Sequence, residues 1–375
     1  MLVSIKKLKR LDLFLLLFFL LAIAYRLYAC FQVPLLTTDV FRNLGYGSHA
    51  MENNFTIYQT RAINFKPEPW SVLWPDITYT YPPAALVFFY TFSIFQLGIF
   101  WVKLTLTIID LFCAYLFYRH VSKLAATLFF CAPVSLWYTS HEGQFEALET
   151  LLIILSVLTI RAKQWRIAGF LLAISFQVKI WGILVVPWLL YEAWRSRSHP
   201  SFTSLLGKVA QGVVLGFIPF LPYYLQKPDL LLTPFKDPLS HFINFNPFTW
   251  NPLATSHWTF YWFSFWTYMA LIALVIAGID GWKKRHSIFS LSPLASFLVI
   301  LKSLKWAQFW YLIAAPGFLF CFLPQRKLIH LLLVIYIMHS LDSPVLIIKE
   351  RSLGNVIGPQ IHLAMESCLF TCNVK

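Results

Sequence analysis

The chain has 375 residues, of which 58% are hydrophobic and 12% are charged, and its formal net charge is +14. Soluble domains carry about 25% charged residues, so this composition excludes an ordinary soluble fold. Apolar runs of about 15 to 22 residues recur from Leu11 onward, and each is near the length of a helix that crosses a bilayer. The runs are continuous rather than alternating, which excludes a transmembrane barrel.

These runs predict one all-α domain over residues 1–375, a polytopic transmembrane bundle of about ten or eleven spans. The positive charges stand in short clusters between the runs, where membrane topology accounts for them, so we expect no nucleic-acid partner. The tail 349–375 shows no periodicity that predicts an element.

The first span covers about Leu11–Cys30, and a cluster of Lys and Arg residues precedes it. Cytoplasmic segments carry an excess of Lys and Arg, so the segment after this span should lie on the outer side. That segment opens a first outer loop of about residues 31–100, whose polar part, Thr37–Pro83, holds four of the chain's 16 acidic residues. Asp39 is the first of these acids and should lie near the membrane surface.

The apolar segment Ala84–Phe100 decides the sidedness of everything after it. If it crossed the membrane, the basic cluster RAKQWR (161–166) would lie outside, against the positive-inside rule. We therefore expect Ala84–Phe100 to lie in the outer leaflet, or to re-enter it, as a juxtamembrane helix. HEGQFE (141–146) then lies outside and RAKQWR inside. The spans between these motifs cover about Trp101–Tyr118, Leu124–Thr139 and Ala147–Ile160.

The run Ile167–Trp194 is broken by Gln177, Lys179 and Gly182. Basic clusters on both sides of this run should be cytoplasmic, which predicts two short helices that enter and return, with Lys179 at the outer turn. A single long helix with a snorkelling Lys is the alternative. The remaining expected spans are Leu205–Leu225, Trp258–Gly278, Phe289–Leu301, Phe309–Leu323 and Leu328–Leu346.

Several ionisable residues are expected on the outer face although topology does not require them there. They are Asp39, Arg42, Glu142, Glu146, Lys179, Lys302 and Lys305. Ionisable groups in or beside membrane spans are costly, which makes them candidates for function. A cation can bind a phosphate group, and a carboxylate can take a proton from a hydroxyl group.

Each candidate also has a structural interpretation. Asp39 could simply cap a helix that begins DVFRNLG. The two glutamates, four residues apart on one helix face, could face water, and the two late lysines could anchor at the lipid headgroups. The prolines that follow Tyr81 could do no more than start a helix.

Short motifs recur in a fixed order over most of residues 1–320. An outer loop opens with Asp (TTDVFRNLGYG), YPP enters an apolar helix, and GQ with a following acid (HEGQFEAL) begins a span. The run IAGFLLAISFQVKIWGILVVPWLL then places a Lys before a Pro, and KWAQFWYLIAAP stands late in the chain. This order resembles the GT-C superfamily of membrane glycosyltransferases. It is most similar to the branches that use polyprenol-phosphate-mannose, which include bacterial enzymes and GPI-anchor mannosyltransferases.

The resemblance implies transfer of a hexose, with mannose expected, from a polyprenyl or dolichyl phosphate to a hydroxyl group. The acceptor would be a lipid-linked or cell-envelope glycan, and the anomeric centre would invert. The resemblance also implies roles for named residues. The catalytic group would comprise Asp39 as base with Glu146 and Glu142, the phosphate would be held by Arg42, Lys179, Lys302 and Lys305, and the substrate would contact Tyr81, Gln144 and Gln308.

The expected partners are the lipid-phosphate sugar, the glycan or glycolipid acceptor, and membrane lipid. The sequence shows no metal-ligand spacing. A divalent cation could be bound only by a pair of the carboxylates expected on the outer face. A bacterial plasma membrane with the active site on its outer face is favoured over the endoplasmic reticulum. The alternatives are a membrane transporter or flippase for lipid-linked sugars, and a non-catalytic membrane subunit, which the presence of Asp39 disfavours.

Overall fold

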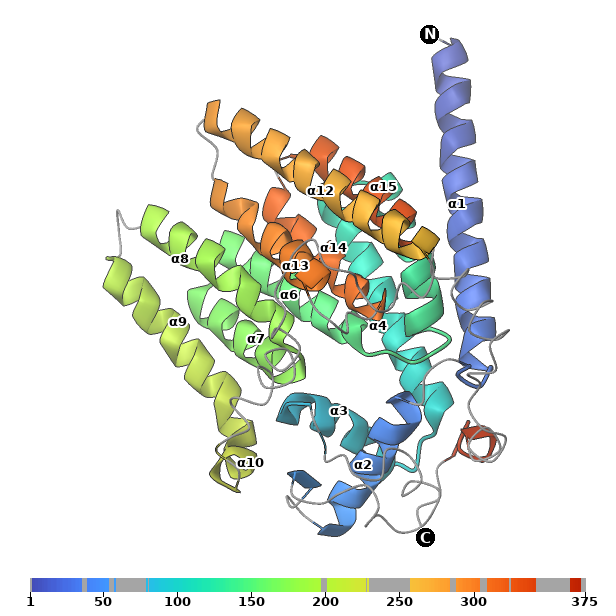
Figure 1. Cartoon of the computed structure of the whole chain (residues 1–375), viewed down its shortest axis with the longest axis vertical. Coiled ribbons are helices and arrows are strands. Elements are labelled where there is room, and N and C mark those ends of the chain that lie inside the picture. The colour runs from blue at the N-terminus through green and yellow to red at the C-terminus, as the bar shows by residue number, and fades with distance from the viewer. Residues whose placement is uncertain are drawn as a thin grey trace.

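The computed structural model describes residues 2–35, 39–53, 57–58, 79, 81–196, 201–226, 228, 257–283, 288–303, 309–323, 325–341 and 365–371. Within these residues the chain is helical, and an isolated antiparallel bridge joins Leu97 to Thr371. The predicted all-α fold is therefore confirmed. The helices form a bundle, and α1 (Leu2–Cys30) stands along one edge of it (Figure 1).

Three of the described helical stretches are long and apolar enough to cross a membrane. They are Asp12–Cys30 within α1, α4 (Ile99–His120), and Phe202–Leu225, which runs through α9 (Phe202–Phe217), η6 (Ile218–Phe220) and α10 (Leu221–Gln226). A fourth follows if Ser135–His141 and Glu146–Arg161 count as one broken span. The shorter apolar helices, of 10–17 residues, include Pro83–Ile94, Trp165–Val178, Ser292–Leu301 and Leu312–Phe322, and the apolar stretch Phe265–Ile279 lies within the 27-residue helix His257–Lys283.

The other elements complete the bundle. In chain order they are α2 (Asp39–Asn53), α3 (Pro83–Ile94), α5 (Lys123–Phe130), η4 (Ser135–Thr139), α6 (Glu146–Arg161), α7 (Trp165–Val178), η5 (Ile180–Val185), α8 (Val186–Arg195), α12 (His257–Lys283), η9 (Ile288–Ser290), α13 (Ser292–Ser303), η10 (Phe309–Ala314), α14 (Ala315–Phe318), η11 (Leu319–Phe322) and α15 (Arg326–Ser340).

The expected span Leu124–Thr139 is interrupted in the structure. The helix α5 ends at Phe130, and the π-helix η4 follows after a short turn. Pro133 accounts for the interruption, because a proline disfavours helical backbone in the residue before it. The segment that contains η4 meets α6 at an angle of 115°. HEGQFE therefore occupies a sharp turn between two helical segments.

A buried ion pair fixes this turn relative to α1 and α4. Arg26 Nη1 lies 3.0 Å from Asp110 Oδ2, and both side chains have 0% exposure. The same guanidinium donates to Ser140 Oγ at 2.9 Å, to Ser135 Oγ at 2.9 Å and to the Phe130 carbonyl at 2.8 Å. Breaking a buried pair from one side costs about 3–5 kcal/mol, so this network is a strong constraint on the bundle.

The helices α7 and α9 pack with their backbones in close contact. A Cβ atom built on Gly169 would overlap the Val209 carbonyl oxygen, and one built on Gly212 would overlap the Arg166 carbonyl oxygen. Small residues permit this approach in membrane bundles, where van der Waals packing drives helix association. The contact fixes the position of α7, whose C-terminal end leads to Lys179.

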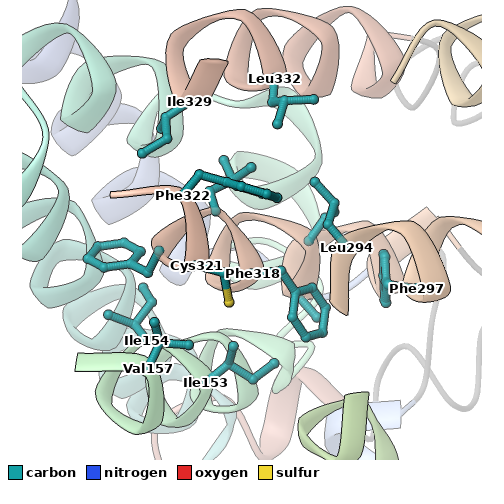
Figure 2. Close-up of a cluster of buried hydrophobic side chains, with 14 of the residues drawn as sticks. Ile153, Ile154, Val157, Leu294, Phe297, Phe318, Cys321, Phe322, Ile329 and Leu332 are labelled. Atoms are coloured by element: carbon teal, nitrogen blue, oxygen red, sulfur yellow. The ribbon is translucent and has the colours of Figure 1, made fainter. Parts of the chain in front are cut away.

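A hydrophobic core joins the late helices to α6. Side chains from α6, α13, α14, η11 and α15 converge in the cluster that Figure 2 shows. Its labelled members include Ile153, Ile154, Val157, Leu294, Phe297, Phe318, Cys321, Phe322, Ile329 and Leu332. This core supports α6 from one side, while the polar turn before α6 lies toward α2.

The helices α2 and α3 lie together at one end of the bundle (Figure 1). They pack closely, because a Cβ atom on Gly47 would lie 2.9 Å from the Phe89 carbonyl carbon and from Ser93 Oγ. With 12 residues, α3 is about 18 Å long, which is too short to cross a hydrocarbon core of about 30 Å. Its length agrees with a juxtamembrane helix, and its sidedness stays a prediction.

Candidate active site

The first acidic residue of the outer loop begins α2. Asp39 is the first residue of this helix, where an acidic side chain complements the helix dipole. Its Oδ1 lies 2.9 Å from Arg42 Nη2, and its Oδ2 accepts a hydrogen bond from Gln144 Nε2 at 3.1 Å. Asp39 and Arg42 keep 17% and 15% of their side-chain surface exposed, so both can be reached from outside.

The surroundings of Arg42 favour its charged form. Burial is the largest single effect and opposes the charge, but the carboxylate of Asp39 and the neighbouring tyrosines together outweigh burial and raise the pKa of Arg42 above its ordinary value. A carboxylate oxygen has two lone pairs, so Asp39 can hold Arg42 and Gln144 and still accept a proton.

The turn 141–146 brings the GQ motif to α2. Gly143 has a φ of +75°, a conformation that side chains with a Cβ rarely adopt. A Cβ atom there would also lie 2.9 Å from Val40 Cγ2 of α2. Glycine therefore permits both the turn and its close approach to α2, and the turn delivers Gln144 to Asp39.

The predicted helix break at Lys179 is confirmed, so the alternative of a single long helix is wrong. Lys179 is extended, with φ −156° and ψ 157°, between α7 and the 3₁₀ helix η5. Its ammonium forms a buried ion pair with Glu146 Oε1. The ammonium also lies 4.9 Å from the Phe145 ring centroid and 5.6 Å from the Tyr81 ring centroid. Aromatic faces stabilise a cation at these distances.

Tyrosine and phenylalanine rings surround the charged groups. The Tyr81 ring lies 5.0 Å from Phe145 and 5.8 Å from Tyr79, and Tyr79 lies 5.0 Å from Tyr46 on α2. The Tyr58 hydroxyl donates to the Tyr81 carbonyl oxygen at 3.0 Å. The rings thus form a wall that begins at α2 and ends beside the Lys179 ammonium.

Glu149 belongs to this neighbourhood although sequence reasoning missed it. Its carboxyl has 0% exposure, and Oε1 accepts from Ser175 Oγ at 2.9 Å and from the Gly182 amide at 2.8 Å. Ser175 precedes Lys179 and Gly182 follows it, so the hydrogen bonds of Glu149 connect the two sides of the helix break. An acidic residue within an apolar run (EALETLLIIL) was the signal that could have identified it.

Glu142 lies on a different side of the turn. It has 0% exposure, and its Oε1 accepts from the Leu35 amide at 3.1 Å and pairs with His141 Nδ1 at 2.9 Å. Lys103 donates to the carbonyl oxygens of Ala29 and Gln32 at 2.7 and 2.5 Å. These contacts hold the linker between α1 and α2, which carries Asp39 into place.

The structure brings together six of the ten residues that the sequence nominated for the site. These are Asp39, Arg42, Tyr81, Gln144, Glu146 and Lys179. Lys302 lies near the end of α13, but its side chain is outside the described part of the structure. Lys305 and Gln308 lie outside the described residues altogether.

Metal ligands are not grouped in the parts of the chain that the structure describes, where no cluster of three His, Cys, Asp or Glu side chains occurs. Asp39 and Glu146 are each paired with a cation instead. An apolar groove of about 750 Å³ is found elsewhere, between α1, α4 and α5. It is lined by residues such as Leu16, Tyr115 and Tyr118, and none of the site residues contributes to it.

The arrangement offers two chemical functions, proton acceptance by a carboxylate and phosphate binding by cations. Asp39 offers a partly exposed carboxylate that can take a proton, Arg42 offers a cation beside it, and Lys179 offers a second cation beside Glu146, and such cations can bind a phosphate group. Comparison with known proteins connects the chain to an activity. Residues 79–227 match the model of glycosyltransferase family 87, and this range contains Tyr81, Gln144, Glu146 and Lys179. No curated protein and no solved structure matches the chain. On this match and its long apolar helices, the protein is a membrane glycosyltransferase.

Proposed function

We propose that the protein moves a hexose, mannose in the first instance, from a polyprenyl-phosphate donor to a hydroxyl group of a lipid-linked or cell-envelope glycan. The observation that carries this proposal is the grouping of one partly exposed carboxylate, Asp39, with Arg42 and Gln144, and the Lys179–Glu146 pair that begins two residues after Gln144. A base and a phosphate-binding cation are the two groups that such a transfer needs.

Asp39 is the proposed base. It takes the proton of the acceptor hydroxyl as that oxygen bonds to the anomeric carbon, and the bond from this carbon to the phosphate oxygen breaks. The polyprenyl phosphate leaves with the bonding electrons, and the configuration inverts because attack and departure occur on opposite faces. The hydrogen bond from Gln144 and the ion pair with Arg42 support this role, because both orient the carboxylate.

Lys179 and Arg42 are the described candidates for the phosphate, with Lys302 and Lys305 as further candidates by sequence. An ammonium has three donors, which is enough to bind Glu146 and a phosphate oxygen together. The aromatic wall around Tyr81 supports sugar binding, because apolar ring faces pack against the C–H surface of a pyranose. The remaining candidates, Glu142 and Gln308, keep the catalytic and substrate-binding roles that the resemblance implies.

The outer face of a bacterial plasma membrane is the proposed location of the site. The Lys and Arg distribution supports this sidedness. On a background without native cysteines, Phe95→Cys should react with an impermeant thiol reagent from outside, and Ala162→Cys from the cytoplasm. Both positions are exposed, Phe95 after α3 and Ala162 after α6. The reverse pattern would overturn the assigned sidedness and leave the transfer activity itself unaffected.

The experiment that tests the function uses the full chain, purified and inserted into lipid nanodiscs. It is offered a panel of radiolabelled polyprenyl-phosphate sugars and, in parallel, the matching nucleotide sugars, with alkyl hexosides and envelope glycolipids as acceptors. We expect transfer from the lipid phosphate only, with mannose the best hexose and inverted stereochemistry in the product. Transfer from a nucleotide sugar alone, or retention of configuration, would refute the proposal.

A further inference from the structure

A second polar feature lies on α2 one turn beyond Asp39. Asn43 has 1% exposure, and neither its Nδ2 nor its Oδ1 has a hydrogen-bond partner within the described structure. Residues four apart are neighbours on a helix surface, so Asn43 lies beside Asp39 on the same face of α2. A buried amide with both of its polar atoms unused is unusual, because buried polar groups are nearly always paired.

The aromatic wall contains a matching group. Tyr79 has 2% exposure, and its hydroxyl likewise has no hydrogen-bond partner within the described structure. Burial raises the pKa of Tyr79 well above its ordinary value, so the hydroxyl stays neutral and can both donate and accept. Its ring packs 5.0 Å from Tyr46, which follows Asn43 on α2 by three residues. Tyr79 and Asn43 are therefore linked through one neighbouring side chain.

Two comparable hydroxyl groups nearby are satisfied. The hydroxyl of Tyr58, a residue with the same 2% exposure, donates to the Tyr81 carbonyl oxygen at 3.0 Å, and its ring lies 5.6 Å from the Tyr79 ring. Ser93, with 3% exposure, donates at 3.3 Å to the carbonyls of Leu44 and Phe89. These two buried hydroxyls are therefore paired, whereas Asn43 and Tyr79 have no partner within the described residues.

We propose that Asn43 and Tyr79 form a hydroxyl-binding subsite for a sugar. The side-chain amide of Asn43 supplies an NH2 donor and a carbonyl acceptor, and Tyr79 supplies a hydroxyl that can bond to the same sugar from the side of the aromatic wall. A site built to hydrogen-bond a sugar hydroxyl rejects an analogue that lacks it, so these residues set hexose specificity. The inference rests on the proposed function. The sugar is either the donor hexose or the acceptor hexose, and separate kinetics distinguish the two.

The test combines stability with kinetics in the full-length protein. Asn43→Leu and Tyr79→Phe are measured for thermal unfolding in detergent and for KM toward polyprenyl-phosphate mannose and toward an alkyl mannoside. We expect an unchanged or raised unfolding temperature, because each change removes a buried polar group that has no partner. We also expect roughly a 10-fold rise in one of the two KM values, the size expected for one hydrogen bond lost in a desolvated site.

Two control variants should show the opposite effect on the unfolding temperature. Ser93→Ala and Tyr58→Phe each remove a hydroxyl that has a partner, so both should lower the unfolding temperature. Ser93→Ala should leave both KM values unchanged. A set of deoxy mannosides identifies the hydroxyl that is recognised. The analogue that lacks this hydroxyl should have a higher KM than the parent mannoside with the wild type, but the same KM as the parent mannoside with Asn43→Leu.

The outcomes distinguish a failure of the proposed subsite from a failure of the proposed sugar transfer. If Asn43→Leu and Tyr79→Phe lower the unfolding temperature as the controls do, the two groups are structural and the subsite is refuted, whether or not the protein transfers sugar. If both variants transfer mannose with wild-type KM values for donor and acceptor, the subsite is refuted and the proposed function stands. A KM change confined to the donor or to the acceptor assigns the subsite to that sugar.

Discussion

Replacing Glu149 should loosen the helix break that carries Lys179. Its Oε1 accepts hydrogen bonds from Ser175 Oγ and from the Gly182 amide, one on each side of the break. In Glu149→Leu both donors stay buried without an acceptor, and each such donor costs about 1–3 kcal/mol, or roughly 2–6 kcal/mol together. Glu149→Gln keeps an amide oxygen in the same place, so most of this stability should return.

The kinetic effect follows from the position of Lys179. If the break relaxes, the ammonium no longer meets the donor phosphate, and a charge-assisted hydrogen bond of about 1.5–3 kcal/mol corresponds to a rise of about 10- to 150-fold in donor KM. We expect this rise in Glu149→Leu and a near wild-type donor KM in Glu149→Gln. The measurement is initial-rate kinetics with lipid-phosphate donor in nanodiscs, together with thermal unfolding of each variant.

A control on the same helix separates positioning from general damage. Ser156 also has 0% exposure on α6, and its hydroxyl donates to the Leu152 carbonyl at 2.7 Å. Ser156→Ala should lower stability without changing donor KM. If Glu149→Leu is destabilised but keeps the wild-type donor KM, then Glu149 supports the fold alone and does not position Lys179.

The remaining predictions concern the base, the cation and the helix packing. Asp39→Asn should keep the helix start, because Asn caps as well as Asp, yet lose about 10²- to 10⁴-fold in turnover; turnover within a few-fold of wild type would make Asp39 structural. Lys179→Gln should raise donor KM and destabilise the protein by leaving Glu146 unpaired, and adding Glu146→Gln should restore stability without restoring KM. Gly212→Ala should destabilise by steric overlap, whereas Gly207→Ala, where a Cβ meets nothing within 4 Å, should be neutral or gain up to about 1 kcal/mol; equal unfolding temperatures would contradict the close α7–α9 contact.

Local sequence patterns predicted the features that depend on neighbouring residues. The apolar runs located α4, α6 and α12 to within a few residues, and DVFRNLG correctly predicted a helix that begins at Asp39. The break at Lys179 was predictable because polar residues and a glycine interrupt one apolar run. Positive-inside reasoning likewise required a short, non-spanning segment where the structure has α3.

Features that depend on distant partners could not be predicted in this way. Glu142 and Glu146 were open to a water-facing interpretation, but both have 0% exposure, because one is bonded to the Leu35 amide and the other to Lys179. No local pattern shows a pairing across 107 or 33 residues. The sequence also could not show that the buried amide of Asn43 has no partner among the described residues, because burial and pairing are properties of the folded chain.

The ion pair between Arg26 and Asp110 imposes an order on the synthesis of this protein. The two residues are 84 positions apart. At about 5–20 residues per second, the ribosome therefore adds Asp110 roughly 4–17 seconds after Arg26. During that interval α1 carries an uncompensated arginine, which disfavours its insertion alone by about 2.5–3.5 kcal/mol if it lies at bilayer depth. We expect α1 to remain beside the insertion machinery until α4 emerges. Nascent chains stalled before Asp110 should therefore crosslink to that machinery through α1, and chains stalled well after α4 should not.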